Sequence, residues 1–215
     1  MKKEELAKLA DELDKCTACV FRESAIAPVG WFGNPESPIV FVGEGPGGVE
    51  DDYGCPLIGP SGQLLDKALW SVKMTRDRVL TTNVIKCRPR NHKTPNIAEA
   101  DFCGKLWLEK ELAIIQPKVI VALGGVALHF LGNADMRITK DRGQWFKTTQ
   151  GFDCIATFHP AYLLRLSGHD LVTAKWDVFH DLEDARDKVI AAAPDYQLAS
   201  EAPTNLFALF EKRKK

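Results

Sequence analysis

Four short apolar runs that alternate with helical patterns constrain the fold of this chain more than any other feature of its sequence. The expected strands cover residues 38–42, 78–84, 119–123 and 154–158. Apolar residues recur with the period of a helix over residues 3–15, 63–72, 97–115, 124–131 and 170–191. Strands that alternate with helices in this way predict an α/β fold whose central sheet is mostly parallel.

The length and composition fit one globular domain. With 215 residues, 45% of them hydrophobic and 27% charged, the chain can bury a core of its own and does not resemble a disordered or low-complexity sequence. We expect the domain over residues 1–191 and a linker with a C-terminal tail over residues 192–215.

The charge and the polar N-terminus narrow the function classes. No apolar run approaches the roughly 18–20 residues that span a bilayer, and residues 1–15 are too polar for a signal peptide. We therefore expect a cytoplasmic protein without membrane contact. The net charge of −1 excludes a histone-like polycation, but it leaves room for a nucleic-acid binder whose positive charge is local.

Polar and glycine-rich segments follow three of the expected strands. Gly43–Gly48 comes after the first, Asn83 lies at the end of the second, and His159-Pro160 comes after the fourth. Ligands of open parallel sheets bind beyond the carboxyl ends of the strands. The three segments are therefore predicted to meet around one pocket.

The glycine-rich segment matches G-x-G-x-x-G over residues 43–48, a pattern that is also typical of dinucleotide-binding folds. No helix is expected to open within the motif, and the chain is expected to stay irregular for another dozen residues. Four carboxylates nearby would repel a pyrophosphate: Glu44, Glu50, Asp51 and Asp52. This acidic loop is better suited to hold a cation, orient water or stabilise positive charge.

The six cysteines divide into a candidate metal set and two core residues. Cys16 and Cys19 form a C-x-x-C pair, and Cys87 and Cys103 follow singly. One close pair with two scattered thiols favours a four-thiolate iron–sulfur cluster, while a zinc site or ordinary cysteines remain alternatives. Cys154 in an expected strand reads as a small hydrophobe, as does Cys55.

Three motifs together resemble the family 4, iron–sulfur uracil-DNA glycosylases. Residues 43–65, with GEGPG, GCPLIG and SGQLL, resemble the first motif of that family. TNVIKCRP at 82–89 is similar to its second signature and HPAYLLR at 159–165 to its last. The resemblance runs from about residue 10 to 190, and the four cysteines fall where the family has its cluster ligands.

The resemblance implies a fold, an activity and a cofactor. The fold would be three-layered, α/β/α, around a four-stranded, mostly parallel sheet. The activity would be DNA repair by a monofunctional hydrolase that flips uracil out of single- or double-stranded DNA, cleaves its N-glycosidic bond and leaves an abasic site. The protein would act as a monomer and carry a [4Fe-4S] cluster on Cys16, Cys19, Cys87 and Cys103.

The resemblance also assigns roles within the pocket. His159 would donate a hydrogen bond to uracil O2 as negative charge grows on the departing base, and Asn83 would match uracil N3–H and O4 with its amide. Glu44 or Glu50 would position water and stabilise the cationic sugar. The catalytic candidates are His159, Glu44, Glu50 and Asn83, and the uracil-binding candidates are Glu44, Gly45, Pro46, Leu57, Asn83 and His159.

Two positions depart from the family pattern. Leu57 stands where the family usually has an aromatic ring that stacks on uracil, and Tyr53 or Phe158 would have to supply a ring instead. His92 precedes Lys-Thr-Pro, as does a histidine with which a related branch captures the sugar covalently. Two alternatives follow: covalent capture of uracil-DNA through His92, or a metal-containing DNA-binding module without catalysis.

Two further segments are candidate contacts with macromolecules. A basic segment and the residues after His159 are the DNA-binding candidates, and an apolar wedge there would open the base stack. They are Lys86, Arg88, Arg90, Lys93, Tyr162, Leu163, Leu164 and Arg165, although one of the two leucines is expected in the core. The tail, with Leu206, Leu209 and Phe210, loosely resembles the short helix that binds sliding clamps.

Overall fold

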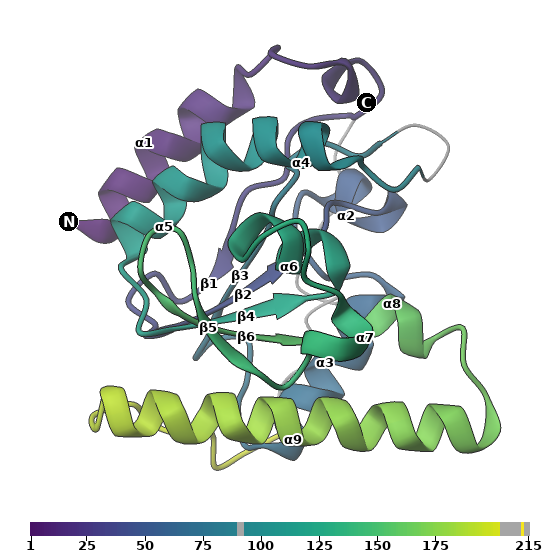
Figure 1. Cartoon of the computed structure of the whole chain (residues 1–215). Helices are drawn as coiled ribbons and strands as arrows, with labels where there is room; N and C mark the ends of the chain where they lie inside the picture. The colour runs from purple at the N-terminus through teal and green to yellow at the C-terminus, as the bar shows by residue number, and fades with distance from the viewer. Residues whose placement is uncertain (90–92, 203–211, 213–215) are drawn as a thin grey trace.

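The computed structural model describes residues 1–89, 93–202 and 212, and a twisted sheet of six strands lies at its centre (Figure 1). The order is β1-β3-β2-β4-β6-β5. The strands are β1 (Phe32–Gly33), β2 (Ile39–Gly43), β3 (Leu80–Asn83), β4 (Val119–Leu123), β5 (Trp145–Lys147) and β6 (Asp153–Thr157). The inner strands β3, β2, β4 and β6 pair in parallel, and the edge strands β1 and β5 pair antiparallel.

The inner strands are continuous apolar runs because both faces of the sheet are covered. Alternate residues of β2 point to opposite sides: Val40 and Val42 join one core cluster, whereas Ile39 and Phe41 join the other. Two apolar cores on opposite faces of one sheet make the three-layered α/β/α architecture that was expected.

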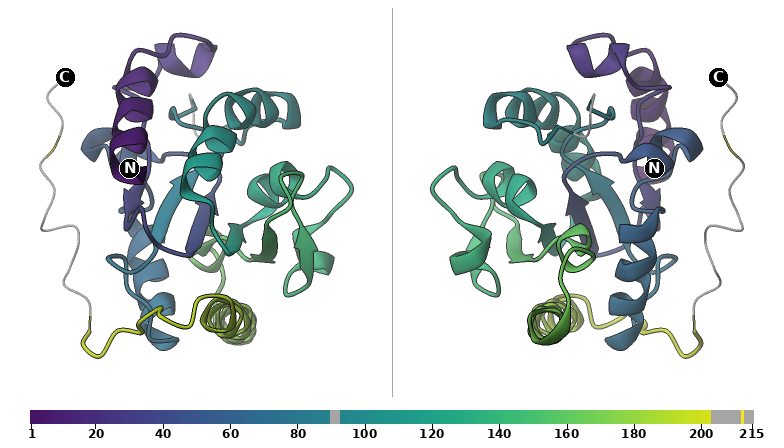
Figure 2. Two further views of the ribbon diagram at one scale, coloured as in Figure 1. Left: turned by 90° about the vertical axis from the view of Figure 1, so that its left-hand side faces the viewer. Right: turned by 90° about the vertical axis from the view of Figure 1, so that its right-hand side faces the viewer.

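Helices cover both faces (Figure 1). The first core is closed by α1 (Lys2–Asp14), α4 (Ile97–Cys103), the π-helical turn η3 (Gly104–Leu108), α5 (Glu109–Ile115) and α6 (Gly125–Leu131). The second core is closed by α3 (Pro60–Ser71), α8 (Pro160–Leu163) and the long α9 (Gly168–Ala192), which Figure 2 shows end-on. Short helices complete the order: η1 (Val20–Glu23), α2 (Gly48–Tyr53) and α7 (Ile138–Asp141). The expectation of an irregular chain after the glycine-rich motif was wrong, because α2 begins at Gly48, the last residue of that motif.

The sheet differs from the expected one in its edges. Four strands were predicted, and these are the parallel strands β2, β3, β4 and β6. The additional strands β1 and β5 have two and three residues, and none of their residues is fully buried. Such short, half-exposed strands have no apolar run of their own and exist because a neighbouring strand offers hydrogen bonds.

Part of the expected linker packs against the domain. The Ala199 N–H donates to the Lys73 carbonyl at 2.8 Å, and Tyr196 and Leu198 pack against the second core. The tail segment proposed to bind a sliding clamp lies outside the described residues. Among the helices of the described part, none combines the length and the apolar character that crossing a membrane requires.

Candidate active site

Two of the three segments that were predicted to meet, the glycine-rich loop and the segment at His159, line one pocket beyond the carboxyl ends of the parallel strands, together with the loop that follows Asn83; Asn83 itself is not among its lining residues. The volume of the pocket is about 340 Å³. The loop after β2 contributes Glu44–Gly47, Glu50 and Leu57; the loop after β3 contributes Arg88, Pro89, Lys93 and Thr94; the segment after β6 contributes His159, Ala161, Tyr162 and Arg165. Ser61 of α3 completes the lining.

His159 reaches the pocket from the end of β6, where it caps the short helix α8. Its Nδ1 accepts a hydrogen bond from the Ala161 N–H at 3.1 Å. Burial lowers the pKa of His159 to about 4, and the positive charge of Arg165 acts in the same direction. The imidazole is therefore neutral at pH 7, and with Nδ1 accepting, its proton is assigned to Nε2. A neutral N–H donor results in the wall of the pocket.

Asn83 is the last residue of β3, and its amide is buried without a partner. The side chain is 1% exposed, and neither Oδ1 nor Nδ2 makes a hydrogen bond to any described residue. It lies over Gly43, its register partner on β2, where a Cβ atom would collide with Oδ1. A buried amide left in this state costs about 1–3 kcal/mol, so the site is poised to accept a partner with both a donor and an acceptor.

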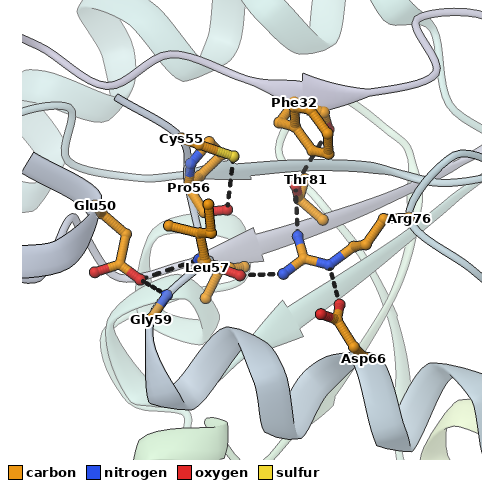
Figure 3. Close-up of polar contacts among 10 residues, drawn as sticks. Phe32, Glu50, Cys55, Pro56, Leu57, Gly59, Asp66, Arg76 and Thr81 are labelled. Atoms are coloured by element: carbon orange, nitrogen blue, oxygen red, sulfur yellow. Dashed lines mark hydrogen bonds and ion pairs between the residues drawn. The ribbon is translucent and has the colours of Figure 1, made fainter. Parts of the chain in front are cut away.

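The two glutamates of the acidic loop have different surroundings. Glu50 is buried, and its two oxygens accept the N–H groups of Gly47, Ile58 and Gly59 at 3.1, 3.1 and 2.8 Å; Figure 3 shows the bond to Gly59. Glu44 is half-buried in the pocket wall and makes no such set of bonds. Burial raises the pKa of Glu44, and Arg165 opposes the rise. Glu50 therefore folds the loop, whereas Glu44 offers its carboxylate to the cavity.

An aromatic ring lines the pocket, at a position other than the two expected to replace an aromatic residue at Leu57. Among the described residues, neither Tyr53 nor Phe158 lines the pocket, but Tyr162 does. The rings of Tyr162 and Phe158 are in contact, with centroids 4.9 Å apart. The sequence analysis placed Tyr162 with the DNA contacts and not with the base pocket, because nothing in the one-dimensional pattern shows that α8 turns back over the cavity.

Two of the expected DNA contacts are wrong. Lys86 is 1% exposed, and its ammonium bonds Glu111 Oε2 and Thr82 Oγ1, each at 2.7 Å, so it cannot reach a phosphate. Leu163 is buried in the second core, as one of the two leucines was expected to be. Both side chains are buried against residues that are distant in sequence, which the local sequence pattern does not show.

The other expected DNA contacts that the structure describes lie at or next to the pocket. Arg88, Lys93, Tyr162 and Arg165 line its rim, and Leu164 beside them is 52% exposed. Arg88 packs against Gly48, whose hypothetical Cβ would lie 3.3 Å from the guanidinium carbon. Arg90 and His92 are outside the described residues. The pocket thus opens between basic side chains and one exposed leucine.

The four candidate metal ligands come from three separate segments. Cys16 and Cys19 follow α1, while Cys87 follows β3 and Cys103 ends α4; all four are free thiols. Burial raises the pKa of Cys87 to about 12 and that of Cys103 to about 11, and in both cases the thiols of Cys16 and Cys19 contribute. The Lys86 N–H also donates to Cys103 Sγ at 3.4 Å. The four thiols are thus near enough to influence one another.

The same sulfurs do not form a compact site for a single ion. Within residues 1–89, 93–202 and 212, no group of three or more His, Cys, Asp or Glu side chains is arranged to hold one metal ion. Cys55 and Cys154 are buried, and burial raises the pKa of both, to about 12 for Cys55. They behave as small core residues, as their sequence context indicated.

The chain matches known proteins over most of its length. The family model described as the uracil DNA glycosylase superfamily matches residues 31–183. The chain is 41% identical to the type-4 uracil-DNA glycosylase of Thermotoga maritima over 86% of this chain and 95% of that protein. It is 36% identical to the type-4 enzyme of Archaeoglobus fulgidus, over 75% of this chain and 84% of that one. It is 35% identical to the type-4 uracil-DNA glycosylase of Sulfurisphaera tokodaii, over 74% of this chain and 76% of that protein.

Proposed function

Because this chain belongs to the uracil-DNA glycosylase superfamily, we propose that its pocket holds one uracil flipped out of DNA while the N-glycosidic bond is hydrolysed and an abasic site is left. The protein is a uracil-DNA glycosylase of DNA repair, a hydrolase of N-glycosyl bonds. One observation carries the assignment: the buried amide of Asn83, at the carboxyl end of β3, has no hydrogen-bond partner among the described residues.

Asn83 selects the base in this proposal. Uracil presents an N–H donor at N3 beside a carbonyl acceptor at O4, and the amide of Asn83 offers the matching acceptor and donor. Cytosine presents the reverse pattern on that edge. Because both amide atoms are unpaired in the buried site, a base that matches them removes the cost of their isolation, and a base that does not match leaves that cost in place.

His159 stabilises the departing base. As the C1′–N1 bond breaks, negative charge develops on uracil and positive charge on the sugar. The Nε2–H of the neutral imidazole donates to uracil O2, while the Ala161 N–H bond fixes the ring and its tautomer. Glu44 holds the attacking water, since burial raises the pKa of its carboxyl group and so makes it a better proton acceptor. Glu50 keeps the loop in shape.

The rim of the pocket binds the DNA strand. Arg88, Lys93 and Arg165 provide the local positive charge that a chain of net charge −1 needs in order to bind phosphates. Leu164 is exposed beside them and is the apolar side chain that enters the base stack in place of the flipped nucleotide. Tyr162 supplies the apolar wall that Leu57 alone does not provide.

Cys16, Cys19, Cys87 and Cys103 would hold a [4Fe-4S] cluster. Four thiols that influence one another and lie against the first core fit such a group, which binds each thiolate to a different iron atom. When bound, the cluster supplies a cross-link between segments, and no step of base removal passes through it. The protein's own side chains position the base, hold the attacking water and donate a hydrogen bond to uracil O2.

Cleavage of a uracil-containing oligonucleotide after alkali treatment tests the assignment. We expect the wild type to release uracil and His159→Ala and Asn83→Ala each to lose about 100-fold or more in kcat/KM, since each removes a preorganised contact. His169→Ala, which changes an exposed histidine of α9, is the control and should match the wild type. An oligonucleotide left intact by the wild type, or full activity in both variants, would contradict the proposal.

The same gels, run under denaturing conditions without alkali, address covalent capture. We expect no protein–DNA adduct, because water and not His92 attacks the sugar in this proposal. A wild-type adduct that disappears in His92→Ala would instead establish capture through that histidine.

A further inference from the structure

Leu57 forms part of the pocket in a backbone conformation that L-residues rarely adopt. Its φ angle is +54°, in the left-handed region, although its side chain is buried and lies beside Gly43, the register partner of Asn83. A non-glycine residue in this region costs about 1–3 kcal/mol and persists only where its surroundings enforce it. Something in the fold must therefore hold this peptide in place.

Two neighbours fix the carbonyl of Leu57. Gly62 in the first turns of α3 lies so close that a Cβ atom there would overlap the Leu57 carbonyl oxygen. The guanidinium of Arg76 donates from Nη2 to the same oxygen (Figure 3). The adjacent N–H groups of Ile58 and Gly59 are bound by Glu50. The peptide that carries the Leu57 side chain is thus held on both sides.

Arg76 joins this carbonyl to the strand that ends in Asn83. Its side chain is 2% exposed, with Nε on Asp66 Oδ1 at 2.7 Å and Nη1 on Thr81 Oγ1 at 3.0 Å. Thr81 stands two residues before Asn83 on β3. One planar guanidinium therefore sets the distance between the Leu57 peptide and the strand of the uracil-reading amide, a geometry that lysine cannot reproduce.

We propose that Arg76 is a positioning residue for base recognition: acting through the Leu57 carbonyl and Thr81, it sets the width of the slot between the Leu57 side chain and the Asn83 amide into which uracil fits. The inference rests on the proposed function. Arg76 is buried and touches neither base nor DNA. Substitution of Arg76 should therefore lower the affinity for the base and leave the affinity for the DNA backbone unchanged.

Arg76→Lys tests this, since lysine keeps the charge beside Asp66 but cannot make all three bonds at once. We expect the variant to fold, to bind free uracil as a competitive inhibitor about tenfold more weakly, and to lose kcat/KM on uracil-containing DNA by a similar factor. Its affinity for DNA that carries an abasic site, where no base enters the slot, should stay within about twofold of the wild type.

Two further variants separate positioning from stability. Val189→Ala removes buried methyl groups that α9 contributes to the second core and so lowers stability; it should leave both affinities unchanged. Gly62→Ala places a Cβ atom against the Leu57 carbonyl and 3.2 Å from Arg76 Nη2, so it displaces the same peptide and should reproduce the selective loss of uracil affinity. It replaces Arg76→Lys as the test if that variant does not fold.

The binding measurements distinguish the possible outcomes. Selective loss of uracil affinity in Arg76→Lys or Gly62→Ala supports the inference. Unchanged uracil affinity in a folded variant, or equal losses for uracil and abasic DNA, overturns it. A wild type that leaves uracil-containing DNA intact would overturn the proposed function and this inference with it, whereas an active wild type with an unaffected Arg76→Lys would overturn the inference alone.

Discussion

At the scale of single residues, the pocket depends on two polar groups whose states are set by burial. The imidazole of His159 is neutral because it is removed from water, and the Ala161 N–H determines which nitrogen carries the proton. The amide of Asn83 is held in a place where no group in the described part of the chain satisfies it. Both arrangements cost folding free energy, and both leave the site ready for a base.

The stability of the protein should report the buried His159. Its pKa is about 4 in the folded protein and 6.5 ordinarily, so between these values the unfolded chain binds more protons. The free energy of unfolding should therefore fall as the pH decreases from 6.5 to 4, and His159→Gln should lack this part of the fall. Urea unfolding of both proteins at pH 7.5 and pH 5 checks this, and parallel losses in both would contradict it.

At the scale of elements, β3 is anchored on both faces. Thr81 points to one side and accepts from Arg76, whereas Thr82 points to the other and donates to Glu111 Oε2 at 2.7 Å. Glu111 on α5 also pairs with the ammonium of Lys86 at 2.7 Å, and both charges are almost fully buried. Two buried cations, Arg76 and Lys86, thus bind threonines on opposite faces of β3, the strand whose last residue is Asn83.

Removing one partner of this buried pair should be costly. Glu111→Ala leaves the Lys86 ammonium without compensation, so we expect a loss of about 3–5 kcal/mol in the free energy of unfolding. The double variant Lys86→Met with Glu111→Leu should recover most of it, because it buries no charge. Denaturant unfolding measures both.

An exposed pair provides the comparison. On the surface, Lys105 Nζ lies 3.4 Å from Asp101 Oδ2. Asp101→Ala should lower the free energy of unfolding by at most about 1 kcal/mol. A Glu111→Ala variant as stable as Asp101→Ala would show that the buried pair does not have the role assigned to it.

At the scale of the whole molecule, the four cysteines proposed as cluster ligands lie in separate parts of the chain. Cys16 and Cys19 belong to the N-terminal segment, Cys87 to the loop after β3 and Cys103 to the end of α4. A group bound to all four would fasten α1 and the basic loop to the first core. The loop after β3 also carries Arg88 and Lys93 of the pocket rim, so this fastening bears on DNA binding.

Loss of one cysteine ligand should prevent cluster binding and so loosen α1 from the first core. We expect Cys19→Ser to lose iron, measured by metal analysis, and to show faster hydrogen exchange in α1, because binding free energy of such a group is folding free energy. Cys154→Ala is the matched control: it removes a thiol from β6 in the core and should keep its iron. Retention of iron and of α1 protection in Cys19→Ser would contradict the proposed ligand set.

The sequence alone determined the features that depend on local pattern. The four parallel strands were predicted from their apolar runs, since strands covered on both faces need such runs wherever they lie. The glycine loop, Asn83 and His159 were predicted to meet because the carboxyl ends of parallel strands share one edge. Each of these inferences uses residues that are neighbours in the chain.

Tertiary structure decided the rest, because burial and pairing are made by partners distant in sequence. Lys86 lies in a basic segment, yet Glu111, 25 residues further on, draws it into the core. β1 and β5 are strands only because β3 and β6 lie beside them. The positive φ of Leu57 depends on Gly62 and Arg76 together. No local pattern contains such information, since the free energy that fixes these residues comes from contacts that form only when the layers close.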